Sequence, residues 1–350
     1  MGNVKAGELL SRYRSGGNSA TYGMFANTFH ACANAPAETK EASLKIAHGC
    51  KTSLLRQNKA QLPLPLYNTM VAAFGRCGDI ETAFSIIDEM QNKRVVLECQ
   101  TFNHLLQACI SDRESGFRLA LTIYRRLLNK NVKPTQHTYN LLLKAAKDCG
   151  IGDTEDAYDL LVEAMSSKEV RKFKQKLLEE EADIKRDMIK NLGNDKREGN
   201  SVELVSPSGS DSELAMHNSK PLPPQLPNLL SNQPVMDFIT GLSAKELNSC
   251  SNARLQLFGG VDGFVDVVTN EFNVKIDIKT ISSLINFVNS DLEEEKLLDH
   301  MRQERVKPDI DFFNQLMRRK VERKDYKGKY ILHSHTTRNN LSCQLFWALR

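Results

Sequence analysis

The sequence predicts an all-α superhelical solenoid, in which antiparallel helix pairs stack side by side and a disordered linker interrupts the array. Two kinds of residue recur at a nearly fixed distance and carry this prediction. An aromatic residue followed by asparagine recurs at spacings of 35 and 37 residues, as Tyr67-Asn68, Phe102-Asn103 and Tyr139-Asn140. An alanine recurs at spacings of 37 and 37 residues, as Ala83, Ala120 and Ala157. A fixed period in this range is typical of stacked units, none of which buries its apolar face alone.

The N-terminal region, residues 1–63, is predicted to hold a degenerate helical unit. Tyr22 stands where the aromatic-asparagine pair would be, and a first helix runs from there to about Ala33. A second helix covers about Thr39 to Arg56. Pro63 then marks the start of the first regular unit. Within a helix, proline is tolerated in the first turn but not in the interior.

Residues 64–166 are predicted to form three regular units. In the first unit, Leu66, Met70 and Phe74 fall near helical spacing, so one face of the first helix is apolar. Gly78 ends that helix, because glycine adopts the positive φ that many helix ends require. Ala83 is small where the two helices of the unit cross, so their axes can approach closely. In the second unit, Pro134 ends the second helix.

The regular pattern stops after the third unit. Residues 167–192 are charged and contain neither proline nor glycine, which favours a solvated helix laced by Lys and Glu pairs. Residues 193–234 are rich in Asn, Ser, Gly and Pro and hold six of the eleven prolines. That composition predicts a disordered linker, because it offers too little apolar surface to bury.

A C-terminal helical block, residues 235–327, resumes the array. Its run Arg305-Val306-Lys307-Pro308-Asp309 has the form of Asn131-Val132-Lys133-Pro134-Thr135, which closes the second unit. Counting back one period of 35 residues places a unit at 275–309 and a partial unit at 310–327. Residues 328–350 are predicted to be an irregular tail, since they lack a second helix with a small crossing residue.

Composition limits the function classes only weakly. The formal net charge is +4, from 47 basic and 43 acidic residues, which is too mild to predict a nucleic-acid partner by itself. The eight cysteines form no C-x-x-C pair, which suits a reducing compartment rather than a disulfide scaffold. No stretch is long and apolar enough to span a membrane. Any binding function must therefore be argued from where individual side chains lie.

The repeated residues resemble the pentatricopeptide repeat family. The likeness rests on the aromatic-asparagine openings, the mid-unit alanine, Met90 near the end of a second helix, and the closing Pro134-Thr135 and Pro308-Asp309. The tetratricopeptide repeat is the alternative, but its Trp and Leu-Gly signature is absent and its period is slightly shorter. The stretches from Arg254 to Phe264 and from Asp311 to Gly328 are further similar to an animal mitochondrial member of the family.

The resemblance implies a sequence-selective single-stranded RNA-binding protein without catalysis or cofactors. It implies a place in the mitochondrial matrix, in tRNA 3′-end processing or large-subunit rRNA maturation. The partners would be mitochondrial tRNA precursors or rRNA, with RNA-processing enzymes or the large ribosomal subunit. It also implies an upstream presequence and further repeats outside this chain, in which no transit peptide is evident. The tetratricopeptide alternative implies a protein–protein interaction scaffold instead.

The residue that follows each aromatic is the candidate for base contact. In a stacked array the first helices line one concave surface, and these residues form a line along it: Asn68, Asn103, Asn140 and Asn314. An asparagine amide both donates and accepts, so it can pair with the Watson–Crick edge of an unstacked base. By the resemblance, this residue and the last residue of the repeat jointly choose the base, in the pairs Asn68 with Glu98, Asn103 with Thr135, and Lys279 with Asp309. The alternative is that the asparagines cap the first helices.

Other candidate chemistry is limited. Basic residues further along the first helices are candidates for phosphate contacts, which position a strand without specifying its sequence: Lys144, Lys147, Arg76, Arg318 and Arg319. No catalytic or metal site is predicted. The pairs His30-x-Cys32 and His333-x-His335 lack partners at zinc-like spacing. The H-x-E and P-C-x-x-C signature of nucleobase deaminases is absent.

Overall fold

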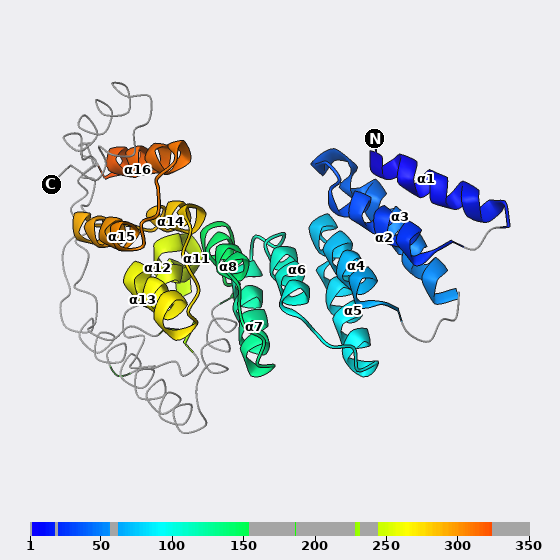
Figure 1. The fold of residues 1–350 in the computed structure, drawn as a ribbon, viewed down its shortest axis with the longest axis horizontal. Coiled ribbons are helices and arrows are strands. Elements are labelled where there is room, and N and C mark those ends of the chain that lie inside the picture. Colours follow the sequence, from blue (N-terminus) through cyan, green and yellow to red (C-terminus); the bar gives the residue numbers. More distant parts are fainter. Residues whose placement is uncertain are drawn as a thin grey trace, which may run out of the picture.

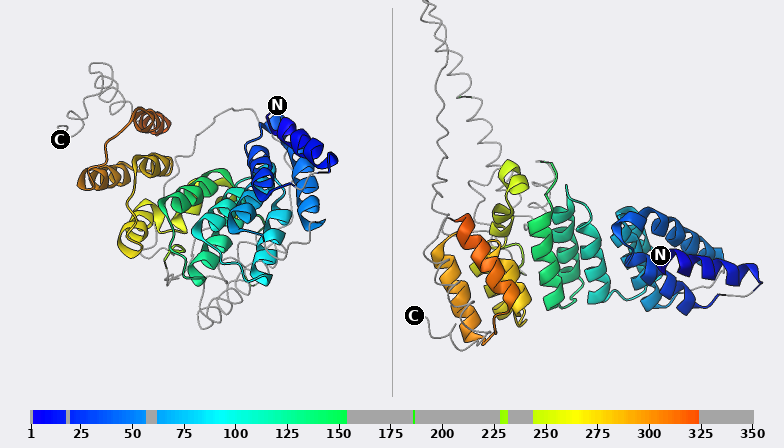
Figure 2. Two further views of the ribbon diagram at one scale, coloured as in Figure 1. Left: turned by 45° about the vertical axis from the view of Figure 1, so that its right-hand side comes forward. Right: turned by 90° about the horizontal axis from the view of Figure 1, so that it is seen from above.

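The computed structural model describes residues 2–17, 20–56, 62–153, 186, 228–231 and 244–323. Apart from one isolated bridge between Asn228 and Phe258, the regular structure in these ranges is helical. The helices stack along the long axis of the molecule, from α1, α2 and α3 at one end to α15 and α16 at the other (Figure 1; Figure 2). The predicted all-α fold of stacked helices is therefore confirmed.

The N-terminal part contains six helices of the array. They are α1 (Gly2–Ser15), α2 (Tyr22–Ala33), the short 3₁₀ helix η1 (Ala37–Thr39), α3 (Lys40–Arg56), α4 (Leu64–Cys77) and α5 (Ile80–Asn92). The predicted helices of the degenerate unit are thus confirmed as α2 and α3. Next along the chain come α6 (Cys99–Cys109), α7 (Gly116–Asn129) and α8 (Gln136–Asp148).

The C-terminal part is built from shorter helices. These are α11 (Ala244–Ser249), α12 (Ser251–Gln256), α13 (Gly260–Asp266), a π-helical turn η2 (Val267–Glu271), α14 (Ile278–Ile285), α15 (Asp291–Gln303) and α16 (Ile310–Glu322). The first helices pack on one another in the order α2, α4, α6, α8, α14 and α16. The array is thus continuous from α8 to α14, although about 130 residues of sequence separate them.

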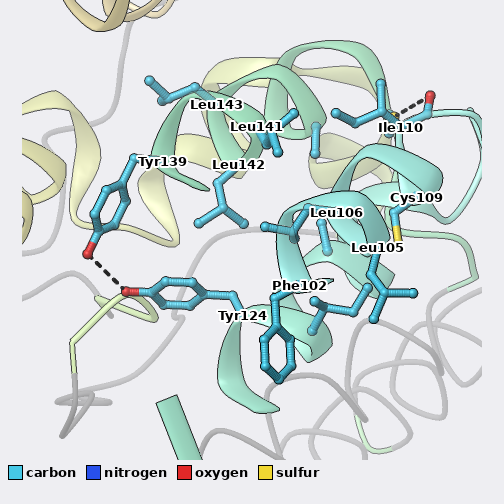
Figure 3. Close-up of a cluster of buried hydrophobic side chains, with 14 of the residues drawn as sticks. Phe102, Leu105, Leu106, Cys109, Ile110, Tyr124, Tyr139, Leu141, Leu142 and Leu143 are labelled. Atoms are coloured by element: carbon cyan, nitrogen blue, oxygen red, sulfur yellow. Dashed lines mark hydrogen bonds between the residues drawn. The ribbon is translucent and has the colours of Figure 1, made fainter. Parts of the chain in front are cut away.

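Close helix contact explains the small residues at the crossings. A Cβ atom on Gly75 of α4 would lie 2.4 Å from the Cβ of Ala108 on α6, so only glycine fits at this crossing. Ala83 of α5 and Ala120 of α7 are almost fully buried, as the sequence predicted. Figure 3 shows the cluster that α6, α7 and α8 share, in which Leu106 and Leu142 face each other. Each unit therefore buries its apolar face against the next.

The same turn closes four units in the described part of the chain, after α5, α7, η2 and α15. It places a residue at positive φ, namely Arg94 (56°), Asn131 (53°), Asn273 (51°) and Arg305 (55°). The valine that follows donates its N–H back into the helix, from Val95, Val132, Val274 and Val306 to the carbonyls of Met90, Leu127, Val268 and Met301 at 2.8–3.2 Å. This is the hydrogen-bond pattern of a helix that ends in a left-handed residue.

The third of these turns changes the prediction for the third unit. The sequence placed that unit's second helix before residue 166, and residues 154–166 lie outside the described ranges. The structure puts the closing turn at Asn273, directly after α13 and η2. Tyr139 of α8 packs its ring against Phe264 of α13 and Phe272, at centroid distances of 5.9 and 6.3 Å. We conclude that α13 and η2 complete the third unit, and that a long insertion separates them from α8.

The start of the fourth unit also differs from the prediction. Counting back 35 residues gave 275, but the first helix of this unit, α14, is capped by Asp277. The count fails because α14 has 8 residues, whereas α4 has 14. The next helix, α16, begins at Ile310 as predicted for the partial unit.

Four residues of the predicted linker are packed. Leu229 and Leu230 are buried, and the Tyr124 hydroxyl donates to the Leu230 carbonyl at 3.1 Å. Arg125 donates to the Ser231 carbonyl at 2.8 Å. The disorder predicted for 193–234 is therefore wrong at 228–231, because two leucines bury there against α7. The remaining linker residues, the tail 328–350, and the charged segment 167–192 apart from Arg186 lie outside the described residues.

Two further observations concern compartment and membrane. Cys109 and Cys149 are buried and form no disulfide within the described residues. Burial raises the pKa of the Cys109 thiol to about 12 and that of Cys149 to about 11. Among the described helices, none combines the length and apolar character that a membrane span requires.

Candidate nucleic-acid interface

The candidate asparagines share one structural position. The residues that cap the N-termini of the first helices are Pro63, Glu98, Thr135, Asp277 and Asp309. Five residues after these caps stand Asn68, Asn103, Asn140, Ser282 and Asn314. The first helices pack side by side (Figure 1), and we infer from this packing that the fifth positions form one line across the units. The alternative that the asparagines are helix caps is wrong, since other residues occupy the cap positions.

The asparagines are less exposed than the sequence suggested. Asn68 is 5% exposed and Asn103 is 8% exposed. Each of three asparagines accepts a hydrogen bond from a threonine of the following unit through Oδ1: Asn68 from Thr101 at 2.8 Å, Asn103 from Thr138 at 2.8 Å, and Asn140 from Thr280 at 2.7 Å. We call these contacts the Thr–Asn bridges. Through these bonds the asparagine of one first helix contacts the first helix of the following unit.

The Thr–Asn bridges have a signal in the sequence that the predictions did not use. Thr101 and Thr138 stand directly before the aromatic of each pair, three residues after the cap. Thr280 has the same place after Asp277, where the aromatic is replaced by Ile281. All three threonines are nearly fully buried. A buried hydroxyl requires a partner, and the asparagine of the preceding unit supplies it.

Three pairs of a fifth-position residue with the last residue of its repeat were predicted, and the structure brings one of them together. The Nδ2 of Asn103 lies 3.5 Å from the Thr135 hydroxyl, which is at the limit of a hydrogen bond. Between Asn68 and Glu98 there is no hydrogen bond in the described part of the chain. Glu98 caps α6 without using its side chain.

The third predicted pair, Lys279 with Asp309, is wrong in its first member. Lys279 lies two residues after the cap Asp277, and Ser282 occupies the fifth position. The error follows from the count of 35 residues, which started the unit at 275. The run Asn273-Val274-Lys275-Ile276-Asp277 matches the close of the second unit and could have given the correct start. Asp309 caps α16, accepting from the Phe312 N–H at 2.7 Å.

Two fifth-position residues lack a bridge. Ser282 is buried, and its hydroxyl has no partner among the described residues. The reason is that Phe312 stands in the following unit where the other units have threonine. Asn314 is exposed at the last described unit, where no following first helix is described.

The predicted phosphate contacts divide into two groups. The side chain of Lys144 is exposed, and its ammonium group makes no hydrogen bond within the described ranges. Lys147 is also exposed, but its Nζ donates to Asn286 of the next unit at 3.2 Å. Arg76 bridges its neighbours on both sides, donating to Asn34 at 2.7 Å and to Gln107 at 3.0 Å. Arg76 and Lys147 therefore support the array as well as adding charge to it.

Two cations, Arg76 and Lys279, act on histidines of the first helices α6 and α8. Burial lowers the pKa of His104, which follows Asn103, to about 4, and the nearby Arg76 and His137 add to the shift. Burial also lowers the pKa of His137, with Lys279 and Arg76 contributing. Both histidines are thus held neutral at pH 7, and fixed positive charge from Arg76 and Lys279 acts on them. A row of amides with neighbouring cations can bind an extended polyanion that carries hydrogen-bonding bases.

Comparison with known proteins supplies the family context. The model of the pentatricopeptide repeat domain matches residues 85–148 and 268–323, and that of the PPR repeat matches residues 66–95. The chain is 29% identical over 345 residues to the mouse pentatricopeptide repeat-containing protein 1, mitochondrial, covering 87% of this chain and 47% of that protein. For the rat protein of the same name the values are 30% over 339 residues, 87% and 48%. The chain therefore spans about half the length of these relatives.

A solved structure was also matched. It is the pentatricopeptide repeat protein PPR10 in complex with an 18-nt psaJ RNA element, with a TM-score of 0.33 and 14% sequence identity. The match covers 96% of this chain and 39% of that chain.

Proposed function

Because this chain belongs to the pentatricopeptide repeat family, we propose that it binds single-stranded RNA in a sequence-selective manner, without catalysis. The observation that carries the proposal is the line of amides at the fifth position of successive first helices, flanked by Arg76 and Lys279. An unstacked base offers its Watson–Crick edge to such an amide. The backbone of the strand follows the cations.

The bases are read by Asn68, Asn103, Asn140 and Asn314, with Thr135 beside Asn103 as a second contact. In the fourth unit Ser282 occupies the base-contact position that the sequence had assigned to Lys279. Lys144 and Lys147 meet phosphates, because both ammonium groups are exposed on first helices. These contacts carry no sequence information and set the affinity and its salt dependence.

The cellular role that we propose is mitochondrial RNA metabolism in the matrix, in tRNA 3′-end processing or large-subunit rRNA maturation. The support for the compartment is the mitochondrial designation of the relatives that span 87% of this chain. Mitochondrial tRNA precursors or rRNA are then the RNA partners, and RNA-processing enzymes or the large ribosomal subunit are the protein partners. Crosslinking and sequencing of RNA bound to the tagged protein in cells tests this role, and enrichment of other transcripts alone contradicts it.

A binding experiment separates RNA recognition from a protein-binding scaffold. The full chain is titrated into fluorescein-labelled 14-nucleotide oligo(U), oligo(C) and oligo(A), with anisotropy as the readout and unlabelled duplex DNA as competitor. We expect single-stranded RNA to bind and its affinity to fall as salt rises, because counterions are released from phosphates. Duplex DNA should compete poorly, because its bases are paired and offer no free Watson–Crick edge to the amides. The control replaces Lys144 and Lys147 with Glu. No binding to any single strand at 50 mM salt, together with tight binding of a protein partner, refutes the proposal in favour of the scaffold.

A further inference from the structure

The hydrogen bonds of Thr138 fix how the Asn103 amide is turned. The Thr138 hydroxyl oxygen accepts the backbone N–H of Thr135 at 3.1 Å, within a reciprocal cap at the start of α8. Its own proton can then be donated, and Asn103 Oδ1 is the nearest acceptor at 2.8 Å. The Thr138 hydroxyl also contacts Thr135 Oγ1 at 3.1 Å and Cys99 Sγ at 3.5 Å, contacts in which either group can be the donor. Because the amide oxygen is held in this way, the amide can offer a base only its Nδ2 donors, which otherwise make two long contacts, to Thr135 Oγ1 at 3.5 Å and to Cys99 Sγ at 3.7 Å.

We propose that the threonine three residues after each cap is a specificity-determining positioning residue. Its hydroxyl locks the asparagine of the preceding unit in the orientation that presents N–H donors to RNA. This inference rests on the proposed function and goes beyond it, since it assigns a role to residues that do not touch the base. Thr101 acts on Asn68, and Thr138 acts on Asn103.

The units differ in how firmly the amide is held. The amide nitrogens of Asn68 and Asn140 have no hydrogen-bond partner in the described part of the chain, so both remain available. Thr280, however, has two competing acceptors, Asn140 Oδ1 at 2.7 Å and Asp277 Oδ1 at 2.8 Å. One hydroxyl proton cannot serve both, so the Asn140 amide is free to turn whenever the proton goes to Asp277. Within the described residues the Thr101 hydroxyl has Asn68 Oδ1 as its one side-chain acceptor, and Asn103 Oδ1 is the nearest acceptor of Thr138, so Asn68 and Asn103 are the more firmly held positions.

Base chemistry gives the consequence of the lock. The Watson–Crick edge of uracil carries two acceptors, O2 and O4, and that of cytosine carries O2 and N3. The edges of adenine and guanine each carry one acceptor, N1 and O6. Every one of the four bases also carries at least one N–H donor on this edge, so the bases differ in the number of acceptors, two for the pyrimidines and one for the purines. An amide that presents only donors therefore favours pyrimidines. An amide that can turn over also meets purine donors through its oxygen, and selectivity falls.

The test removes the two locking hydroxyls in the full chain. The variant Thr101→Val with Thr138→Val keeps the shape of the side chains and abolishes the donors. The readout is the ratio of the dissociation constants for oligo(A) and oligo(U), 14 nucleotides each. We expect this ratio to fall at least about fivefold, the lower end of the range for a two-point base contact, while the salt dependence is unchanged. Thr101→Ser with Thr138→Ser keeps the hydroxyls and should retain the wild-type ratio.

A second variant keeps the test decisive if the valine variant does not fold. Asn68→Asp with Asn103→Asp retains an oxygen for each threonine but turns the outward group from a donor into an acceptor. Loss of oligo(U) affinity as large as that of the corresponding Ala variant is expected. An aspartate variant that binds oligo(U) as the wild type does overturns the inference.

The outcomes separate the two proposals. Wild-type protein that binds no single-stranded RNA refutes the proposed function and the inference with it. Wild-type protein that binds RNA, together with a folded valine variant whose ratio is unchanged, refutes the inference alone. A purely structural role of the threonines lowers the melting temperature and leaves the ratio as it is. As an internal comparison, Thr280→Val should change the ratio less than Thr138→Val. The reason is that the Thr280 proton is already shared between Asn140 and Asp277, so the Asn140 amide is held less firmly in the native protein.

Discussion

Arg254 holds the C-terminal helical block onto α8 and is the basis of our most specific stability prediction. Its side chain is buried, and within the described residues no carboxylate pairs with it. The guanidinium instead donates to four carbonyls: Ala146 at 2.6 Å, Leu247 at 2.7 Å, Asn248 at 3.0 Å and Lys147 at 3.4 Å. Two of these carbonyls belong to the last turn of α8, where helix carbonyls lack partners of their own.

Replacing Arg254 with Met should lower the free energy of unfolding by about 3 kcal/mol. The bonds to Ala146 and Leu247 are the buried ones, and a hydrogen bond to a charged group contributes about 1.5 kcal/mol or more. Methionine fills the volume of the stem but leaves these carbonyls without a donor. Arg254→Lys should lose about half as much, since an ammonium group cannot span both carbonyls as a planar guanidinium does.

The assay is equilibrium urea unfolding combined with amide hydrogen exchange. Exchange should speed up at the C-terminal end of α8 and in 244–258, and stay unchanged in α4 and α5, because repeat arrays open locally. Arg113→Met is the matched control. Arg113 also donates to an α8 carbonyl, that of Asp148 at 3.1 Å, but its side chain is 68% exposed, so its loss should cost at most about 1 kcal/mol. Equal losses for the two variants would show that the reasoning about burial is wrong.

Three further predictions concern RNA binding and the thiols. Changing the three asparagines of the Thr–Asn bridges to Ala should weaken binding to a preferred RNA by about 1–3 kcal/mol per contact, and binding to a scrambled RNA much less. Equal losses of affinity for the two RNAs, measured by anisotropy, would mean that the asparagines read no base. Changing Lys144 and Lys147 to Ala should weaken all sequences alike and flatten the salt slope; a change in sequence preference would contradict a phosphate role. In the native protein at pH 7.5, maleimide should label the exposed Cys250 well before Cys109 or Cys149, since burial raises the pKa of both thiols to 11–12; mass spectrometry showing equal rates refutes this.

The sequence determined the repeating unit and the place of its key side chains. Period and apolar spacing were enough to predict α4 to α8 and the line of asparagines, because local patterns fix both helix boundaries and the residues that face a neighbour. The small residues Ala83 and Ala120 were also predicted correctly, since a crossing between closely packed helices admits little else. The orientation of the asparagine amides was not predicted, because their threonine partners come from the next unit.

Only the tertiary structure decided how the array continues after α8. The second helix of the third unit comes from residues 260–271, whereas its first helix, α8, ends at residue 148. No sequence pattern of the repeat connects two segments that lie so far apart in the chain. Burial decides the pairing: Tyr139 needs an apolar partner, and Phe264 and Phe272 supply it whatever their distance in sequence. The same holds for Leu229 and Leu230, which a polar, proline-rich composition had assigned to a linker. A period records contacts between neighbours in the chain, whereas the free energy of burial depends only on neighbours in space.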